Sequence, residues 1–498
     1  MNVLSIILMA IGILIRAALY YPPAMFQIDP DAVVAGICAF RIEHGQYPFF
    51  FPGGNRLSAA SCYLTAAYFH LLGPGRTGLA LTGLTWGVLY LVFMLLFLRA
   101  CLGPKSGCMA FLFVIVPPEQ FMTVTYPPWG YGEIMASCAA TLWLATLWRR
   151  EGLLWQRVCF GLSVGIGLWF SFQTLMIVLP AIVWIASRRR ASMLKESGPS
   201  IVAAAAGALP LVLANVSHSF PTFTQNWAVR AAPSMAIARD DFVWVIGSLI
   251  PHLLFRASGW WSETTILVIA YSIAAVGFAL SLRRTVSNPT QPCSPRNLGM
   301  LLLLVLVATI GIFSASQAGM VRGWTVRYVA PLYVVVPIFL GIGIEGLWSA
   351  ARALSIITAA ALLIPNLLCY GLPGSQLRAQ LTTELSDYMR LERALIQHKV
   401  QLVYGDYTWV YDLNFDTHER VTAVPKVPTA DCFDYGGKLR HAPVRWAAVG
   451  SYDEVEREAK VVGASGTPQQ YGQLWLLIAD YPSPDAAGLL TALRASGI

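Results

Sequence analysis

Residues 298–316 read LGMLLLLVLVATIGIFSAS, nineteen consecutive positions without a charged side chain. A helix of about 20 apolar residues crosses the roughly 30 Å hydrocarbon core of a bilayer. Residues 328–348 form a second run of this kind, interrupted by one acidic residue. These two runs predict membrane-spanning helices and exclude a purely water-soluble fold.

The composition extends this prediction to the whole chain. Of 498 residues, 56% are hydrophobic and only 12% are charged, whereas a soluble domain has about 25% charged residues. The first apolar stretch, residues 3–21, contains Arg16 but has no basic leader and no small-residue cleavage site directly after it, so we expect a retained anchor. The net charge of +8 does not indicate nucleic-acid binding, because the basic residues cluster in short loops between apolar runs.

The apolar runs predict an α-helical polytopic protein with about 11 transmembrane helices. We expect the spans at residues 3–21, 77–98, 107–125, 131–148, 157–172, 174–187, 199–216, 262–282, 298–315, 327–347 and 354–371. The short loops after the even-numbered spans are rich in Arg and Lys and therefore face the cytoplasm. The N-terminus is then cytoplasmic and the C-terminus periplasmic, in a bacterial inner membrane.

Two long outer loops and a C-terminal domain are predicted outside the spans. The loops, residues 22–76 and 217–261, contain apolar stretches too short to cross, which predicts interfacial helices and a vestibule suited to a lipid-linked substrate. Residues 372–498 contain strand-like runs separated by Gly, Pro and Asp. They predict a small periplasmic α/β domain after a transmembrane domain of residues 1–371.

Carboxylates stand at two outer helix ends. Asp29 and Asp31 follow the first span, and Glu133 opens the fourth. Asp31 is a candidate general base, because a carboxylate can accept the proton of an attacking hydroxyl. The alternative is that Asp31 caps a helix beginning at Ala32, and that Glu133 complements a helix dipole.

A basic residue also stands at an outer helix end. Arg327 and Tyr328 open the tenth span, and Arg56 lies in the first loop. Guanidinium groups bind phosphate through paired hydrogen bonds, although an arginine at this depth can also serve as an interfacial anchor.

The sequence lacks the motifs of several other kinds of functional site. The histidines form no metal-binding array, and the sequence has no phosphate-cradling or dinucleotide-binding glycine motif. Cys38 and Cys62 share one outer loop and are either a disulfide or, the favoured interpretation, two buried thiols.

Taken in order along the chain, several motifs resemble the bacterial GT-C glycosyltransferases, the group similar to protein O-mannosyltransferases and lipid A aminoarabinose transferases. These motifs are DPDAVVAG at 29–36, HGQYPFF at 44–50, YL at 63–64, LGP at 72–74, GYGE at 130–133, RYVAPLY at 327–333, YGDYTW at 404–409 and ERV at 419–421.

The resemblance implies a GT-C fold that transfers a sugar from a polyprenyl-phosphate carrier to a lipid, glycan or protein acceptor on the periplasmic face. It implies that Asp31 is the general base or an acid that positions the substrate, that Glu133 is a second acid, and that Arg327 faces the carrier phosphate. The transfer is expected to invert the sugar, and no nucleotide donor is needed, because a polyprenyl phosphate is itself a good leaving group.

The sequence departs from this family at two positions. The family's first-loop Asp-Glu pair ends here in Ala32, and Ser61 stands where a glutamate often precedes the Tyr-Leu pair. That glutamate is where a metal ligand is expected, so its loss argues against dependence on a divalent metal. Two alternatives stay open: a transporter or flippase of lipid-linked sugars, and a catalytically inactive scaffold of the same fold.

Overall fold

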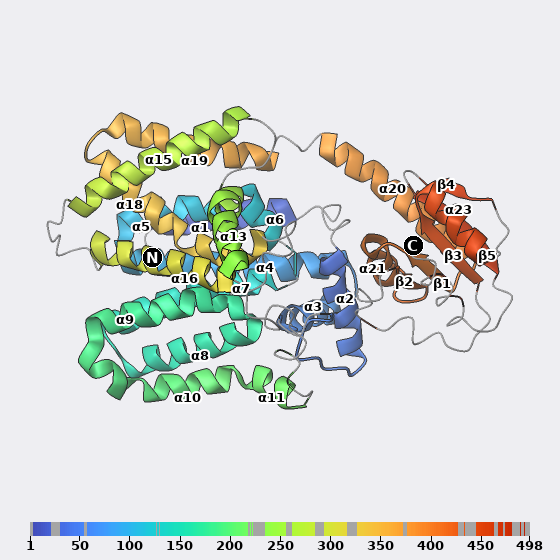
Figure 1. Ribbon diagram of the computed structural model, residues 1–498, viewed down its shortest axis with the longest axis horizontal. Coiled ribbons are helices and arrows are strands. Elements are labelled where there is room, and N and C mark those ends of the chain that lie inside the picture. Colours follow the sequence, from blue (N-terminus) through green and yellow to red (C-terminus); the bar gives the residue numbers. More distant parts are fainter. Residues whose placement is uncertain are drawn as a thin grey trace. The chain divides into compact units, whose positions relative to one another are not determined.

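The apolar stretches of the sequence fold into helices in this computed structural model (Figure 1). One to three helical elements occupy each of the eleven predicted ranges, within the described residues. The structure describes residues 3–20, 30–53, 57–125, 127–128, 130–217, 220, 222, 235–254, 261–283, 293–315, 326–371, 376–426, 433, 445–462, 467–471, 474–480, 489 and 493.

Contacts between residues divide the chain into two compact units. The first contains residues 1–20, 55–60 and 83–372, and the second contains residues 21–54, 61–82 and 373–498. The segments 21–54 and 61–82, which come from the predicted first outer loop, therefore belong to the same unit as the C-terminal segment. The sequence-based division at residues 371 and 372 stays a prediction.

The regular elements that the structure describes in the first unit are helices. Its elements are α1 (Val3–Tyr20), α4 (Arg76–Leu102, whose first turns belong to the second unit), α5 (Pro104–Ile115), α6 (Glu119–Thr125), α7 (Tyr131–Arg150), α8 (Leu154–Phe170), η2 (Phe172–Thr174), α9 (Leu175–Glu196), α10 (Gly198–Gly207), α11 (Leu209–Ser217), α13 (Met235–Trp244), η3 (Val245–Leu249), α14 (Ile250–Leu254), α15 (Trp261–Arg283), α16 (Pro295–Ala315), α17 (Val326–Val329), η5 (Ala330–Val334), α18 (Val336–Trp348) and α19 (Arg352–Gly371).

Three helices of the described chain are long and apolar enough to cross a membrane: α4, α15 and α16. The number rises to five if each of two bent pairs counts as one span. The count of eleven spans stays a prediction, because several of the other helices are shorter than a bilayer requires. The cytoplasmic N-terminus was inferred from those spans and also stays a prediction.

Proline explains both bends. Between α10 and α11 the helix axis turns by 53°, and Pro210 lies at the second residue of α11. A further turn of 48° separates the segment of α17 and η5 from α18, where Pro331 and Pro337 lie. Proline lacks the amide hydrogen for the helical ladder and clashes with the preceding turn, so a straight helix cannot continue through it.

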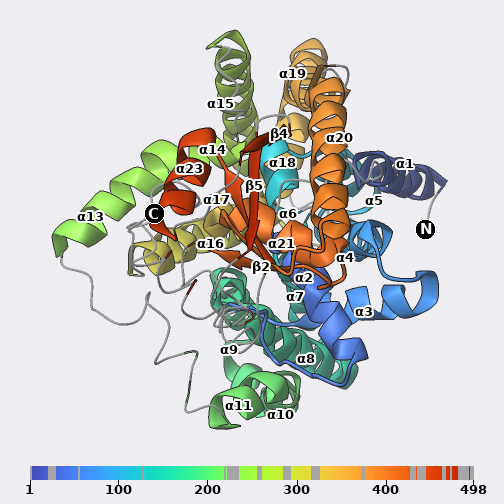
Figure 2. The same ribbon diagram turned by 90° about the vertical axis from the view of Figure 1, so that its right-hand side faces the viewer.

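Glycine permits two close helix contacts in the first unit. A Cβ atom on Gly165 of α8 would lie 2.1 Å from the carbonyl oxygen of Ala204 in α10. Similarly, a Cβ on Gly277 of α15 would lie 2.2 Å from the carbonyl oxygen of Gly343 in α18. Small residues let helix backbones approach in this way within membranes, and Figure 2 shows both helix pairs side by side.

The second unit contains a mixed five-stranded sheet in the order β2-β1-β3-β5-β4. β1 is parallel to β2 and β3, whereas β5 is antiparallel to β3 and β4. The predicted strands at 400–404, 444–449 and 473–479 are confirmed as β1, β3 and β5; β2 and β4 are additional. The elements are α20 (Gln376–Gln397), β1 (Leu402–Gly405), α21 (Tyr407–Asp416), β2 (Thr422–Pro425), β3 (Arg445–Gly450), α23 (Tyr452–Val461), β4 (Gln469–Tyr471) and β5 (Leu474–Asp480).

Two helices from the predicted first loop complete this unit: α2 (Pro30–Glu43) and α3 (Ala60–Leu72). α2 packs against α21 (Figure 1). The contact is so close that a Cβ on Gly36 would lie 2.3 Å from the Phe415 ring. The Phe40 and Phe415 rings stack with centroids 5.3 Å apart, and Phe69 of α3 lies 5.3 Å from Phe40.

Ion pairs fasten the same contact. Arg76, at the start of α4, bonds to Asp412 at 2.8 Å and to Asp416 at 2.5 Å, both on α21. Arg41 of α2 bonds to Glu419 at 3.1 Å. The Asp412 side chain is only 1% exposed, and a charge that is buried to this degree requires a partner. The ion pairs therefore fix the segments 30–43 and 76–82 against the C-terminal segment.

We predict that Arg76→Met lowers the free energy of unfolding by about 3 to 5 kcal/mol, because it leaves the buried Asp412 without its cation. The measurement is the apparent Tm of the purified full chain. Lys460→Met is the control, since Lys460 pairs with Glu456 on the helix surface with both side chains exposed, and such pairs contribute about 0 to 1 kcal/mol. Equal Tm values for the two variants would contradict the role assigned to Arg76.

A second prediction concerns pH and the capping box of α23. The backbone amide of Ser451 donates to the Glu454 carboxylate at 2.9 Å, and this bond, with Lys426 nearby, lowers the pKa of Glu454 from 4.5. A lowered pKa in the folded state means that the carboxylate stabilises the fold above pH 4.5, and that this contribution is lost as the pH falls further.

Glu454→Ala should therefore lower the apparent Tm at pH 7, by the equivalent of about 0.5 to 2 kcal/mol. The difference from the unchanged chain should shrink as the pH falls below about 4.5. The control is Glu456→Ala on the same helix, because Glu456 is half exposed and pairs only with Lys460 on the helix surface among the described contacts. A loss of stability that does not vary with pH would contradict the prediction.

Candidate functional site

Asp31 lies in the first turn of α2, half-buried. The helix begins at Pro30, so the expected cap of a helix starting at Ala32 is wrong: Asp31 is inside the helix rather than before it. An acidic side chain in the first turn is stabilised by the partial positive charge of the helix N-terminus. The candidate base therefore occupies a position that favours its ionised form.

A second residue, Tyr407, binds this carboxylate. The Tyr407 hydroxyl donates a hydrogen bond to Oδ1 of Asp31, across 376 positions of sequence. Tyr407 opens α21, directly after β1 ends at Gly405 and Asp406 turns the chain in an extended conformation. The Tyr407 ring also packs edge-on against Tyr411, with centroids 5.1 Å apart. Sequence reasoning gave Tyr407 no role, although its YGDYTW motif was among those that carry the resemblance.

Glu133 has a different environment from Asp31. It lies in the first turn of α7 and its side chain is fully buried. Oε1 of Glu133 accepts a hydrogen bond of 2.6 Å from the Ser58 hydroxyl, and Ser58 is also fully buried. The Ser58 amide donates in turn to the carbonyl of Phe170. Glu133 thus binds the first-loop segment 57–60 to the start of α7, a contact that sequence reasoning missed.

Backbone conformation and close packing explain why glycine occupies positions 130 and 132 of the GYGE motif. Gly130 precedes α7 with a φ of 108°, a left-handed conformation that glycine adopts without strain. A Cβ on Gly132 would lie 2.9 Å from the Cβ of Trp86 and 3.1 Å from the carbonyl oxygen of Thr125. The two glycines therefore allow the tight turn and the close packing that bury Glu133.

Arg327 lies on the short helix α17, half-buried, with its guanidinium carbon 5.3 Å from the centroid of the Tyr328 ring. α17 continues into η5, which packs against α7, the helix that carries Glu133. The Tyr333 hydroxyl of η5 donates a hydrogen bond of 2.9 Å to the carbonyl of Phe113 and so fixes this turn. Within the first unit, the fold thus brings the elements of Arg327 and Glu133 into one packed group.

The remaining candidates are distributed as follows. Asp29 and Arg56 lie outside the described residues. Asp31 belongs to the second unit, whereas Glu133, Arg327 and Tyr328 belong to the first.

The two departures from the family pattern occupy buried positions. Ala32 is fully buried and Ser61 is 1% exposed. Small side chains without a charge suit such positions, because a buried carboxylate is costly without a partner. Cys38 and Cys62 are buried free thiols, as the favoured interpretation predicted. No group of three or more His, Cys, Asp or Glu side chains that could hold a metal ion occurs among the described residues.

Comparison with solved structures identifies the fold. ArnT from Cupriavidus metallidurans bound to undecaprenyl phosphate matches with a TM-score of 0.65 and 12% identity, over 94% of this chain and 97% of that one. ArnT in the apo state matches with a TM-score of 0.59 and 13% identity, over 93% and 94%. An Archaeoglobus fulgidus oligosaccharyltransferase tethered with an acceptor peptide matches with a TM-score of 0.50 and 11% identity, over 93% and 72%.

Comparisons by sequence return nothing: no protein-family model and no curated protein matches the chain. The similarity is therefore one of fold, at an identity too low to transfer an activity. The expected GT-C fold is confirmed as a fold, and three helices of the described chain are long and apolar enough to cross a membrane.

We predict that Ser58→Ala lowers the free energy of unfolding by about 1.5 to 3 kcal/mol, because it removes a hydrogen bond to a buried carboxylate. The apparent Tm of the purified chain measures the effect. Ser349→Ala is the control, since the Ser349 hydroxyl forms a local bond to a backbone carbonyl at an exposed helix end. The prediction fails if Ser58→Ala is as stable as Ser349→Ala.

Proposed function

We propose that the protein is an inverting glycosyltransferase that moves a sugar from a polyprenyl-phosphate donor to an acceptor on the periplasmic face of a bacterial inner membrane. The observation that carries this proposal is the Asp31 carboxylate, half-buried in the first turn of a helix and bound by Tyr407. It is supported by the likeness of fold to ArnT, which was solved with undecaprenyl phosphate bound.

In the proposed reaction, the acceptor hydroxyl attacks the anomeric carbon of the donor sugar from the face opposite the phosphate. The new carbon–oxygen bond forms as the bond to the phosphate oxygen breaks, which inverts the anomeric configuration. The hydroxyl proton passes to Asp31, and polyprenyl phosphate leaves with the bonding electrons. Asp31 is suited to the base role because a carboxylate can accept the proton of an attacking hydroxyl, and the bond from Tyr407 orients this carboxylate.

Two further candidate residues receive proposed roles that follow from their surroundings. Arg327, with Tyr328 beside it, is proposed to bind the donor phosphate and to stabilise the negative charge that develops on it. Glu133 is fully buried and bonded to Ser58, so its proposed role is to position the first-loop segment rather than to exchange a proton. Asp29 and Arg56 keep their sequence-based roles as a further acid and a further phosphate ligand.

The test is transfer of a radiolabelled sugar from its polyprenyl-phosphate carrier by the purified chain in proteoliposomes. Asp31→Asn should lower kcat at least about 100-fold, since general-base catalysis contributes about 100- to 10,000-fold. Tyr407→Phe should lower kcat by a smaller factor, about tenfold, with little change in the KM of the donor, because the hydroxyl orients the base.

Tyr452→Phe is the control, because Tyr452 is exposed and packs its ring on Trp475 elsewhere in the same unit. Unchanged transfer by Asp31→Asn would remove the base from the mechanism. Movement of the lipid-linked sugar across the bilayer without any transfer would favour the transporter alternative. A chain that binds the donor but catalyses neither process would favour the inactive scaffold.

A further inference from the structure

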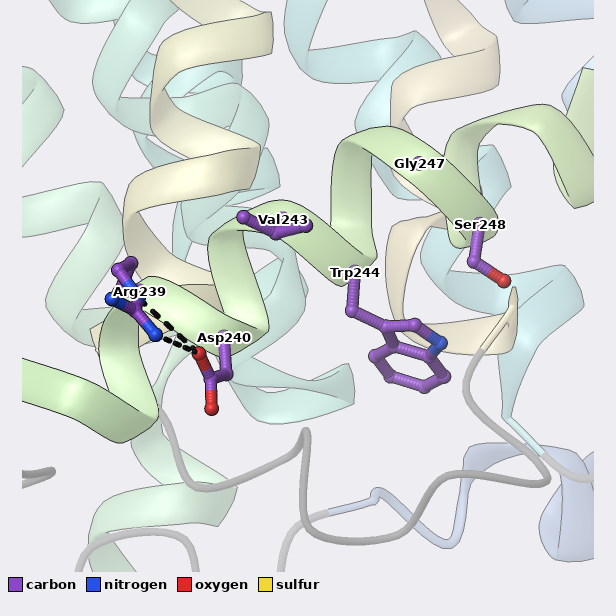
Figure 3. Close-up of a pocket in the computed structure, with 6 residues that line it drawn as sticks. All are labelled: Arg239, Asp240, Val243, Trp244, Gly247 and Ser248. Atoms are coloured by element: carbon purple, nitrogen blue, oxygen red, sulfur yellow. Dashed lines mark hydrogen bonds and ion pairs between the residues drawn. The ribbon is translucent and has the colours of Figure 1, made fainter.

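A groove with no role in the proposed chemistry lies on α13 and η3 of the first unit (Figure 3). Its volume is about 560 Å³, within the range of about 300 to 1,000 Å³ typical of small-molecule sites. Among the described residues, those that line it come from one helical segment: Arg239, Asp240, Val243, Trp244, Gly247 and Ser248.

The polar end of the groove is an ion pair. Nε and Nη2 of Arg239 donate to Oδ1 of Asp240 at 3.3 and 3.2 Å (Figure 3). Both bonds use Oδ1, so Oδ2 can accept hydrogen bonds from a ligand. The side chains are 78% and 53% exposed, so they can meet a ligand without breaking a buried contact. The pair offers donors and an acceptor together and adds no net charge.

The other end of the groove is aromatic. Trp244 is half-buried, and its ring lies 6.2 Å from the Phe313 ring of α16, which restricts its movement. Figure 3 shows Asp240, Trp244 and Ser248 projecting from the same side of the segment. Between them the helix widens into the π-helix η3, a feature that is frequent at functional sites.

We propose that this groove binds a neutral saccharide unit. Pyranose rings present a face of C–H groups that stacks on an indole, and their hydroxyls both donate and accept hydrogen bonds. Trp244 supplies the stacking surface, Asp240 accepts from hydroxyls, and Arg239 donates to them. A phosphate fits less well, because the Asp240 carboxylate would repel it. An alkyl chain fits less well, because it would desolvate the ion pair.

The place of the groove in the fold connects it with the proposed function, on which this inference rests. η3 leads directly into α14, and α14 packs against α17, the helix that carries Arg327. A saccharide bound in the groove therefore lies one helix away from the proposed phosphate ligand. The saccharide comes either from the donor or from the acceptor.

The experiment measures binding without requiring transfer. Saturation-transfer difference NMR of the detergent-purified chain is recorded with three neutral probes: methyl α-D-mannopyranoside, methyl α-D-glucopyranoside and methyl β-D-xylopyranoside. We expect at least one probe to bind, and inorganic phosphate not to displace it. Trp244→Ala and Asp240→Asn should each weaken binding by about tenfold, the effect of losing one well-placed contact.

Matched control variants distinguish a loss of binding at the groove from an effect of any similar substitution elsewhere in the chain. Trp155→Ala replaces another half-exposed tryptophan on α8, and Asp453→Asn removes an exposed carboxylate on α23; both should bind as the unchanged chain does. Trp244→Phe keeps an aromatic ring against Phe313 and should retain most of the binding. This variant, with the exposed Asp240→Asn, keeps the test valid if Trp244→Ala does not fold.

Transfer kinetics then identify the source of the saccharide. A higher KM for the acceptor in Asp240→Asn assigns the groove to the acceptor, and a higher KM for the donor assigns it to the donor. Absence of binding to all three probes, with both KM values unchanged in Asp240→Asn, would overturn the inference. Binding that depends on Trp244 in a chain without transfer would overturn the proposed function and leave the groove assignment in place.

Discussion

The ion pairs of Arg76 are the constraint on which the second unit depends. One guanidinium, mostly buried, bonds to two carboxylates on α21, one of which is almost inaccessible to water. Removing two carboxylates and a guanidinium from water is costly, and the cost is offset only while all three remain together. The first-loop segments and the C-terminal segment therefore fold as one unit. Asp31 is in reach of Tyr407 because α2 lies against α21 in this arrangement.

This arrangement brings a tyrosine of the C-terminal segment to the carboxylate of Asp31, the proposed base. A carboxylate at a membrane surface that serves as a base needs a fixed direction and an accessible oxygen. The N-terminus of α2 favours its ionised form, and Tyr407 fixes its direction. Tyr407, which carries this hydroxyl, is the first residue of α21. This helix directly follows β1, a parallel strand of the C-terminal sheet. The sheet is thus the rigid support from which the candidate base is oriented.

The two candidate acids illustrate how burial separates residue types that look alike in sequence. Asp31 and Glu133 each lie in the first turn of a helix. Asp31 is half-buried and bound through one oxygen to a tyrosine, whereas Glu133 has no exposed surface and bonds to Ser58. An acid of the first kind can exchange a proton with a substrate, and an acid of the second kind holds two segments together. Their shared position at an outer helix end gave no sign of this difference.

The sequence by itself determined the elements and several of the local features. Apolar runs predicted the helical ranges, and short strand-like runs separated by Gly, Pro and Asp predicted three of the five described strands. The glycines beside Glu133 and the prolines at the bends act within a few residues, so their effect can be read locally.

Only the tertiary structure decided which of these elements meet. The bonds of Tyr407 to Asp31 and of Arg76 to Asp412 join positions 376 and 336 residues apart, and Ser58 reaches Glu133 across 75. Nothing in the local pattern distinguishes Tyr407 from neighbouring aromatic residues or Ser58 from other loop serines. Their partners are chosen by the packing of α2 on α21 and of the first loop on α7. That packing reflects the free energy of burying whole surfaces, which no single stretch of sequence contains.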